Sequence, residues 1–242
     1  MIRAFIFDLD GTLVETEMLK ARAYAALAQR LLGLDAPDGR AIKLYGRLVG
    51  STDEVFARAM VEELGLAPAL LCTGGEEPWE ALHRLRMELY RREFGTGEAL
   101  RAAAYEHSLA LLREQRAAGR LAAVATSSFT PEAKRVLALL GVAGRLDAVV
   151  GREQVSRSKP DPEIYLTTAE RLGIRPGEAV VVEDSVVGLA AGVAAGMPCI
   201  AVASAFSGDS LREQTVLAQE WVVYDPVRLP AVAARRIAAA AG

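Results

Sequence analysis

Residues 5–12 read FIFDLDGT, and this stretch decides the fold of the chain. An apolar run ends in two carboxylates one residue apart, and a glycine follows directly. If the strand continues, its two-residue period sends Asp8 and Asp10 toward the same side, and Gly11 lets the backbone turn after them. Two carboxylates at the exposed carboxyl end of a buried strand offer hard oxygen ligands for Mg²⁺. They also place a nucleophile beside a general acid.

Further apolar runs of strand length follow along the chain. They are nearly continuous rather than alternating, which is typical of parallel strands covered on both faces. The sequence predicts strands at Ile2–Phe7, Leu121–Thr126, Ala148–Gly151, Ala179–Val182, Cys199–Val202 and Trp221–Val223.

Helical periodicity fills the intervals between these strands, and a glycine follows each of the helical segments. Alternation of strand and helix at this spacing predicts a doubly wound α/β fold, with a parallel, Rossmann-like sheet. The predicted helices are Ser108–Ala118, Pro131–Leu140, Glu163–Leu172 and Val186–Ala195.

The interval 16–93 departs from this alternation, because it shows helical periodicity and no convincing strand. We interpret it as a small helical domain inserted after the first strand. The α/β core then comprises residues 1–15 and 94–242. Helices are predicted in the insertion at Ala21–Leu32, Thr52–Leu64 and Trp79–Phe94.

Polar side chains recur where the predicted strands end, which is where open α/β sheets bind ligands. Taken singly, each has an ordinary structural role as a turn, cap or surface residue. Their recurrence at four strand ends favours a functional site. Besides Asp8 and Asp10 they are Thr126, Ser127, Ser128, Lys159, Glu183, Asp184 and Ser185.

These residues form a chemically consistent set for phosphoryl transfer. The Asp8 carboxylate can attack phosphorus, and Asp10 can protonate the leaving oxygen and then activate water. Mg²⁺ held by Asp8, Asp184 and the Asp10 carbonyl would offset negative charge. The Thr126 hydroxyl can bind phosphate oxygens together with the amides that follow it, at Ser127.

Lys159 supplies the positive charge of this predicted site and lies in the segment Ser-Lys-Pro-Asp-Pro. As a point charge it would contact the phosphate. Phosphoryl transfer requires chiefly such positioning and electrostatics.

The four segments together resemble the motifs of the haloacid dehalogenase-like (HAD) hydrolases. Residues 8–12 (DLDGT) are similar to the first motif, residues 125–128 to the second, Lys159 to the third and residues 183–185 to the fourth. The resemblance covers essentially the whole chain and implies a branch with a helical cap, which includes phosphoglycolate phosphatases, β-phosphoglucomutases and sugar-phosphate phosphatases. It implies Mg²⁺ dependence, an aspartyl-phosphate on Asp8, and Asp184 as a metal ligand. Glu183 either contacts the metal through water or supports Asp184.

The cap is where the sequence departs from the mutases of this branch. Lys20 occupies the position that resembles a cap-loop histidine, and Thr52 or Asp53 falls where a mutase-like arginine would be. Gly50 and Ser51 are retained in the cap loop. Hydrolysis is therefore favoured over mutase activity.

Arg86 falls near a basic substrate-binding position of the cap. The alternative interpretation, a solvated arginine on a helix face, is slightly favoured. With Lys20, Gly50 and Ser51, it completes the candidate substrate residues of the cap.

Composition narrows the function further. With 242 residues and a net charge of -3, the chain has no basic run, so a nucleic-acid partner is not expected. Two cysteines and two histidines, all isolated, support neither a disulfide framework, a zinc site nor a Ser-His triad. No stretch is apolar enough to span a membrane. We expect a cytoplasmic monomer or homodimer.

The leading hypothesis is a Mg²⁺-dependent phosphatase acting on a small phosphorylated metabolite. A phosphosugar mutase is the alternative within enzymes. A phospho-accepting, receiver-like module is the alternative from another class, because receivers also carry acidic residues, Thr or Ser, and Lys at strand ends. Receivers are usually about half this length, and the helical insertion argues further against one.

Overall fold

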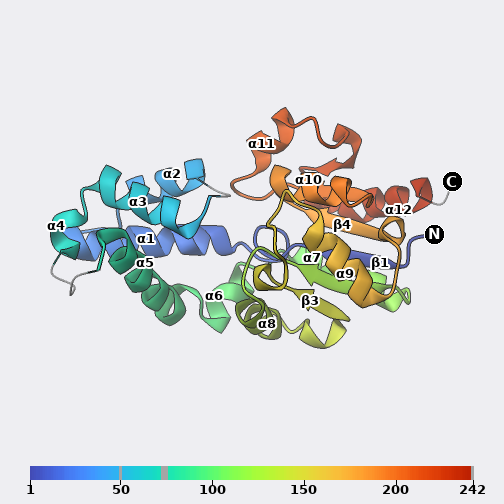
Figure 1. Ribbon diagram of the computed structural model, residues 1–242, viewed down its shortest axis with the longest axis horizontal. Helices are drawn as coiled ribbons and strands as arrows, with labels where there is room; N and C mark the ends of the chain where they lie inside the picture. The colour runs from blue at the N-terminus through green and yellow to red at the C-terminus, as the bar shows by residue number, and fades with distance from the viewer. Residues whose placement is uncertain (49–50, 72–75, 241–242) are drawn as a thin grey trace. The chain divides into compact units, whose positions relative to one another are not determined.

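The computed structural model describes residues 1–48, 51–71 and 76–240, and the chain divides into two compact units (Figure 1). One unit comprises Met1–Glu15 and Arg101–Gly242, and the other comprises Thr16–Leu100. The sequence analysis predicted that the α/β unit resumes at residue 94, but in the structure it resumes at Arg101. The reason is that a π-helical turn, Tyr90–Phe94, continues the helical chain and packs on the first helix of its unit.

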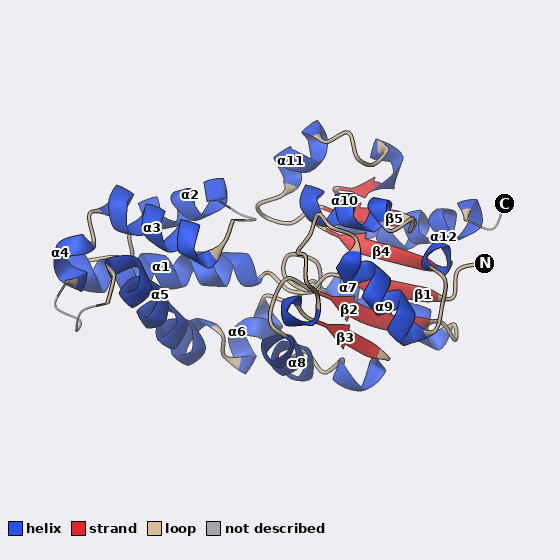
Figure 2. Ribbon diagram, in the orientation of Figure 1, coloured by secondary structure: helices blue, strands red, loops and turns tan. Residues whose placement is uncertain are grey.

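The α/β unit is built on a six-stranded sheet in the order β3-β2-β1-β4-β5-β6, with every pair parallel (Figure 2). This confirms the predicted doubly wound fold. The strands differ from the predicted ranges only at their ends: β1 Ala4–Phe7, β2 Leu121–Ala125, β3 Ala148–Val150, β4 Ala179–Glu183, β5 Cys199–Val202 and β6 Val222–Val223.

The central strand β1 lies between β2 and β4, and the three strands end level with one another. Phe7 is in register with Val124 on one side and with Val182 on the other. The residues that follow therefore emerge side by side at one edge of the sheet, the position where a doubly wound fold binds its ligand.

Helices cover both faces of the sheet because alternate strand residues point to opposite sides. Ala4 and Ile6 share a core with Ile164 and Leu189 of α9 and α10. Helix α7 packs on β2, and helix α12 packs on β5. The helices of this unit are α7 Glu106–Ala117, α8 Thr130–Leu139, α9 Glu163–Leu172, α10 Val186–Ala194, α11 Gly208–Glu213 and α12 Leu229–Ala239, and α6 Gly97–Ala102 crosses the unit boundary.

The helical unit contains the predicted helices and others that the sequence analysis did not identify. The Thr52 hydroxyl accepts the Val55 N–H at the start of one helix, and Gly65 ends it at a φ of 68°. The segment 39–48 is helical although glycines lie at 39 and 46. The helices are α1 Thr16–Leu32, α2 Gly39–Leu48, α3 Asp53–Leu64, α4 Ala67–Leu70 and α5 Pro78–Leu89.

None of the helices in the described ranges combines the length and the hydropathy that crossing a membrane requires.

Candidate active site

The site begins where β1 ends and the chain folds back on itself. The Leu9 carbonyl accepts the N–H groups of Thr12 (3.3 Å) and Leu13 (2.9 Å), which closes a tight turn after Asp8 and Asp10. Gly11 adopts a φ of 85°, which favours glycine. A Cβ at residue 11 would lie 2.2 Å from Asp184 Oδ2, so only glycine lets this turn approach that carboxylate.

Lys159 reaches into this edge from the loop before α9 and bridges two buried carboxylates. Its Nζ donates to Asp8 Oδ1 at 2.7 Å and to Glu183 Oε1 at 2.6 Å, with a third bond to the Ala125 carbonyl at 3.1 Å. The Lys159 side chain is 5% exposed. The predicted cation thus lies against the predicted nucleophile.

Asp10 is oriented by hydroxyl groups that follow β2. Ser128 Oγ donates to Asp10 Oδ2 at 2.6 Å, and Thr126 Oγ1 lies 3.5 Å from the same oxygen. The Thr126 hydroxyl also accepts the Ser128 N–H at 3.0 Å. Ser127, predicted to bind phosphate, is exposed beside them. The bond from Ser128 to Asp10 was not predicted, although Ser128 was part of the motif.

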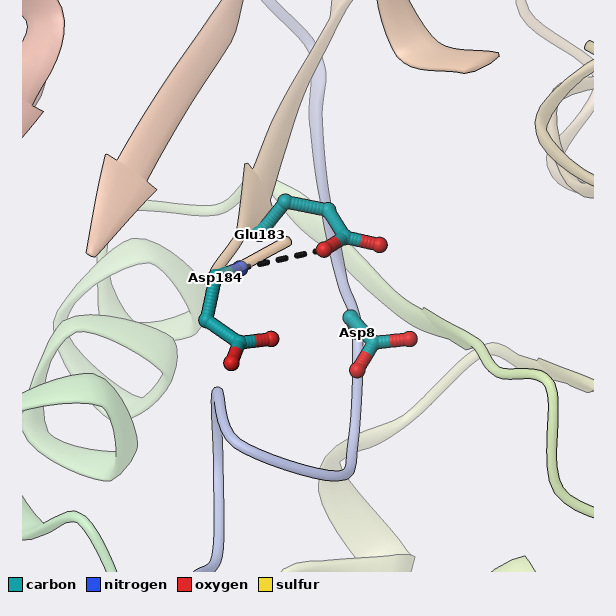
Figure 3. Close-up of side chains that lie close together, drawn as sticks. All are labelled: Asp8, Glu183 and Asp184. Atoms are coloured by element: carbon teal, nitrogen blue, oxygen red, sulfur yellow. Dashed lines mark hydrogen bonds between the residues drawn. The ribbon is translucent and has the colours of Figure 1, made fainter. Parts of the chain in front are cut away.

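Three carboxylates converge at the ends of β1 and β4. Asp8, Glu183 and Asp184 each offer an oxygen, and these oxygens lie within 4.8 Å of one another (Figure 3). All three residues are buried. Lys159 pairs with two of these carboxylates, those of Asp8 and Glu183. A divalent cation fits this cluster because it would offset the remaining negative charge.

The three acids are not equally available to a metal. Glu183 Oε2 accepts the N–H groups of Asp184 and Ser185, both at 3.0 Å, and the Ser185 hydroxyl at 2.9 Å. Its Oε1 is bound by Lys159. The donor set therefore favours Asp8 and Asp184 as direct ligands. The Asp10 carboxylate lies with Ser128 rather than in the cluster, which leaves its carbonyl as the group predicted to face the metal.

Burial dominates the electrostatics of this edge. Burial raises the pKa of Asp8 to about 8, against the lowering effect of Lys159 and with a further rise from Glu183. Burial alone would raise the pKa of Glu183 too, but Lys159 and Ser185 lower it. For Lys159, burial opposes the charge, and the two carboxylates nevertheless raise its pKa. A cation at the cluster would favour the ionised form of Asp8 that nucleophilic attack requires.

The candidate substrate residues of the cap lie in the helical unit. Lys20 pairs with Glu17 at 3.0 Å, and Ser51 is exposed. Gly50 lies outside the described residues.

Arg86 differs from the favoured sequence interpretation of a solvated arginine. Its side chain is 5% exposed, pairs with Asp53 at 3.2 Å and lies 5.3 Å from the centre of the Tyr24 ring. The reason is tertiary: α5 packs against α3 and α1, which brings these partners to it.

Tyr165 is the residue of the site that sequence reasoning missed entirely. It is fully buried in α9, and its hydroxyl donates to Glu183 Oε1 at 3.0 Å. A tyrosine on the apolar face of an amphipathic helix has the pattern of a core residue, so no sequence signal distinguishes it.

Comparison with known proteins assigns the chain to a family. The family model described as haloacid dehalogenase-like hydrolase matches residues 2–196, which include all four segments at the strand ends. The chain belongs to the haloacid dehalogenase-like hydrolases. This HAD-like hydrolase is 32% identical over 196 residues to a phosphorylated carbohydrates phosphatase of Thermotoga maritima, covering 81% of this chain and 82% of the relative.

Other relatives of this HAD-like hydrolase carry related names. A phosphoglycolate phosphatase of Salmonella typhimurium is 28% identical over 230 residues, covering 93% of this chain and 89% of the relative. The crystal structure of a putative β-phosphoglucomutase from Thermotoga maritima aligns with a TM-score of 0.76 at 28% identity, covering 97% of this chain and 99% of that chain. The match to a hydrolase family favours an enzyme over a receiver-like module.

Proposed function

We propose that the chain is a Mg²⁺-dependent phosphomonoester hydrolase that acts through an aspartyl-phosphate on Asp8. The observation that carries the proposal is the position of Asp8. Lys159 Nζ donates to one Asp8 oxygen at 2.7 Å, and Asp8 lies in the carboxylate cluster with Asp184. Asp8 and Asp10 follow the same strand, and the Ser128 hydroxyl donates to Asp10. A nucleophile, a cation and an acid–base group thus share one sheet edge.

In the first half-reaction, the Asp8 carboxylate attacks phosphorus and the bond from phosphorus to the ester oxygen breaks. Asp10, protonated at that moment, donates its proton to the departing oxygen, which leaves as an alcohol. The Ser128 hydroxyl, which follows β2, donates to Asp10 Oδ2 and so orients the Asp10 carboxyl group. Lys159 offsets the charge on the phosphoryl oxygens.

In the second half-reaction, the Asp10 carboxylate takes a proton from water, and the water oxygen attacks phosphorus. The bond from phosphorus to Asp8 breaks, and inorganic phosphate and the free carboxylate result. Asp10 is again protonated, as the next turnover requires. The Thr126 hydroxyl and the N–H groups after it, including that of Ser127, are the proposed phosphate donors.

Asp8 and Asp184, with the Asp10 carbonyl, would hold Mg²⁺, and Glu183 would support them. When bound, the ion draws negative charge from the phosphoryl oxygens and keeps Asp8 ionised.

The proposed substrates are small phosphorylated metabolites of the sugar phosphate or phosphoglycolate type. The names of the relatives support this class. Residues 16–93 are the proposed cap domain, with Lys20, Gly50, Ser51 and Arg86 as its substrate residues. We propose a cytoplasmic location for the protein and a monomeric or homodimeric state.

The test is a screen of phosphorylated metabolites with the full chain, measuring release of inorganic phosphate with Mg²⁺ and with a chelator. We expect release with Mg²⁺ and none with the chelator. Asp8→Asn should lower the rate roughly 10³-fold or more while circular dichroism stays unchanged. An Asp8→Asn protein as active as the wild type would refute the nucleophile.

A matched assay separates hydrolysis from the mutase alternative. The assay uses a hexose 1-phosphate as substrate, once with and once without the hexose bisphosphate. We expect inorganic phosphate as the product under both conditions. Accumulation of hexose 6-phosphate that depends on the bisphosphate would instead favour the mutase.

A further inference from the structure

The buried carboxylate of Glu183 depends on two different groups at its two oxygens. The chain's own backbone and Ser185 saturate Oε2, within two residues of Glu183. At Oε1 the donors come from elsewhere in the sequence: Lys159 at 2.6 Å and the Tyr165 hydroxyl at 3.0 Å. Glu183 is 1% exposed, so water cannot replace a lost donor without opening the site.

Tyr165 contacts the Lys159–Glu183 pair in two ways at once. Its hydroxyl donates to Glu183, and its ring centre lies 5.0 Å from Lys159 Nζ, within the range of a cation–π interaction. The side chain is fully buried, and α9 packs on β2 and β3, which fixes the ring. A flexible lysine is therefore held between a ring face and an acceptor that the same tyrosine orients.

Lys159 has three N–H donors, and three acceptors use them: Asp8, Glu183 and the Ala125 carbonyl. During the proposed reaction the charge on Asp8 is replaced by charge on the phosphoryl oxygens. Lys159 must then keep one fixed partner while another changes. Glu183 is the charged partner that stays, together with the Ala125 carbonyl, and Tyr165 orients Glu183.

We propose that Tyr165 is a positioning residue, whose hydroxyl and ring hold the Lys159–Glu183 pair in the geometry that presents Lys159 to Asp8 and to the transferred phosphoryl group. The inference rests on the proposed phosphatase function. It assigns the tyrosine no contact with the substrate and no ligand to the metal.

The experiment compares the full-length wild type with Tyr165→Phe, which keeps the ring and removes the hydroxyl. We expect kcat to fall about tenfold, because a hydrogen bond to a charged group is lost. The dissociation constant of inorganic phosphate, measured by calorimetry with Mg²⁺, should rise several-fold. The half-saturating Mg²⁺ concentration should stay within about twofold, since the described hydrogen bond of the Tyr165 hydroxyl goes to Glu183 and not to the proposed metal ligands Asp8 and Asp184.

The matched control is Tyr224→Phe in the same unit. Tyr224 also donates through its hydroxyl, to Gln219 at 2.9 Å, and has a cation, Arg212, 4.6 Å from its ring centre. We expect kcat and phosphate affinity to stay at the wild-type values. Because Tyr224 is exposed, this control shows only that loss of a tyrosine hydroxyl outside the site leaves activity unchanged. The unchanged half-saturating Mg²⁺ concentration is what separates positioning from a general structural loss in Tyr165→Phe.

The outcomes separate the two proposals. A wild type without turnover on any phosphomonoester overturns the proposed function. An active wild type with Tyr165→Phe unchanged in kcat and in phosphate affinity overturns the positioning role alone. Should Tyr165→Phe not fold, 4-fluorophenylalanine at residue 165 fills the space of the hydroxyl without donating, and the same comparison applies to it.

Discussion

Asp10, the proposed acid–base residue, illustrates at the residue scale how hydroxyl groups orient a side chain. Its Oδ2 accepts a short bond from Ser128 at 2.6 Å and a long one from Thr126 at 3.5 Å. An acid–base group must face first the leaving oxygen and then the water, so its orientation matters as much as its protonation. Ser128 is the stronger of the two constraints on that orientation.

Replacing Ser128 by alanine should therefore lower kcat. We expect a loss of about three- to tenfold, with little change in KM, because the other described bond to Asp10 Oδ2, from Thr126, is long at 3.5 Å. Steady-state kinetics measures this. Ser210→Ala is the control, since its hydroxyl donates to the Ser207 carbonyl at 2.9 Å in α11. Equal kcat values for Ser128→Ala and the wild type would show that the Ser128 hydroxyl does not orient Asp10 for catalysis.

The positions of the candidate site residues at the strand ends could be predicted from the sequence, because strand period and strand ends depend on local pattern. Asp8, Lys159 and Asp184 were identified in this way, and the structure brings them to one sheet edge. The burial of Arg86 and the contact of Tyr165 with Glu183 could not be predicted, since both depend on partners that other elements bring to them.

At the scale of elements, the site depends on strands that end level and on turns that fit between them. The register of Phe7 with Val124 and Val182 sets three strand ends side by side. The turn after β1 then has to pass Asp184. It does so at Gly11, in a conformation with positive φ.

Gly11→Ala tests this close approach, with Gly119→Ala as the matched control. Both glycines have similar φ values, 85° and 80°, but a Cβ at residue 119 meets nothing within 4 Å. Each substitution should cost about 1–2 kcal/mol in the free energy of unfolding, from backbone strain. We expect only Gly11→Ala to lose activity, by at least about 100-fold, because its methyl group displaces Asp184. Equal activity in the two variants would contradict this role of the turn.

Strands and most helices followed from apolar runs and glycine stop signals, and most of their ends shifted by a residue or two. Larger differences are found at α1, which begins at Thr16 rather than Ala21, and at α5, which ends at Leu89 where a π-helical turn follows. The helix at 39–48 did not follow, because its glycines resemble turn signals. Its buried residues, Ala41, Leu44 and Tyr45, lie on one face, and α2 packs on α1 and α3. Tertiary packing overrides local preference there.

At the scale of the whole molecule, one chain carries an α/β unit interrupted by a helical unit after its first strand. This division could be predicted because the alternation of strand and helix stops between residues 16 and 93. Substrate choice could not, since the proposed substrate residues of the helical unit, such as Lys20 in α1 and Arg86 in α5, lie far apart in the sequence. We expect the stability of the α/β unit to depend on the cation proposed for the acidic cluster.

Mg²⁺ should raise the free energy of unfolding of the whole chain. At a concentration of about 100 times its dissociation constant, the expected gain is about 2.7 kcal/mol, measured by urea unfolding with and without the ion. Asp184→Asn should lose this gain. It should also be more stable than the metal-free wild type, because one of three adjacent carboxylates no longer carries charge. A full Mg²⁺ effect in Asp184→Asn would place the ion elsewhere.

The most direct test of the nucleophile is chemical trapping of the phosphoenzyme. The full chain is mixed with an excess of substrate and Mg²⁺, quenched within milliseconds, reduced with borohydride and analysed by peptide mass spectrometry. Reduction of an acyl phosphate converts that aspartate to homoserine, so we expect homoserine at residue 8 in the wild type and none without substrate. Homoserine at another aspartate, or rapid turnover with no labelled residue, would contradict covalent catalysis by Asp8.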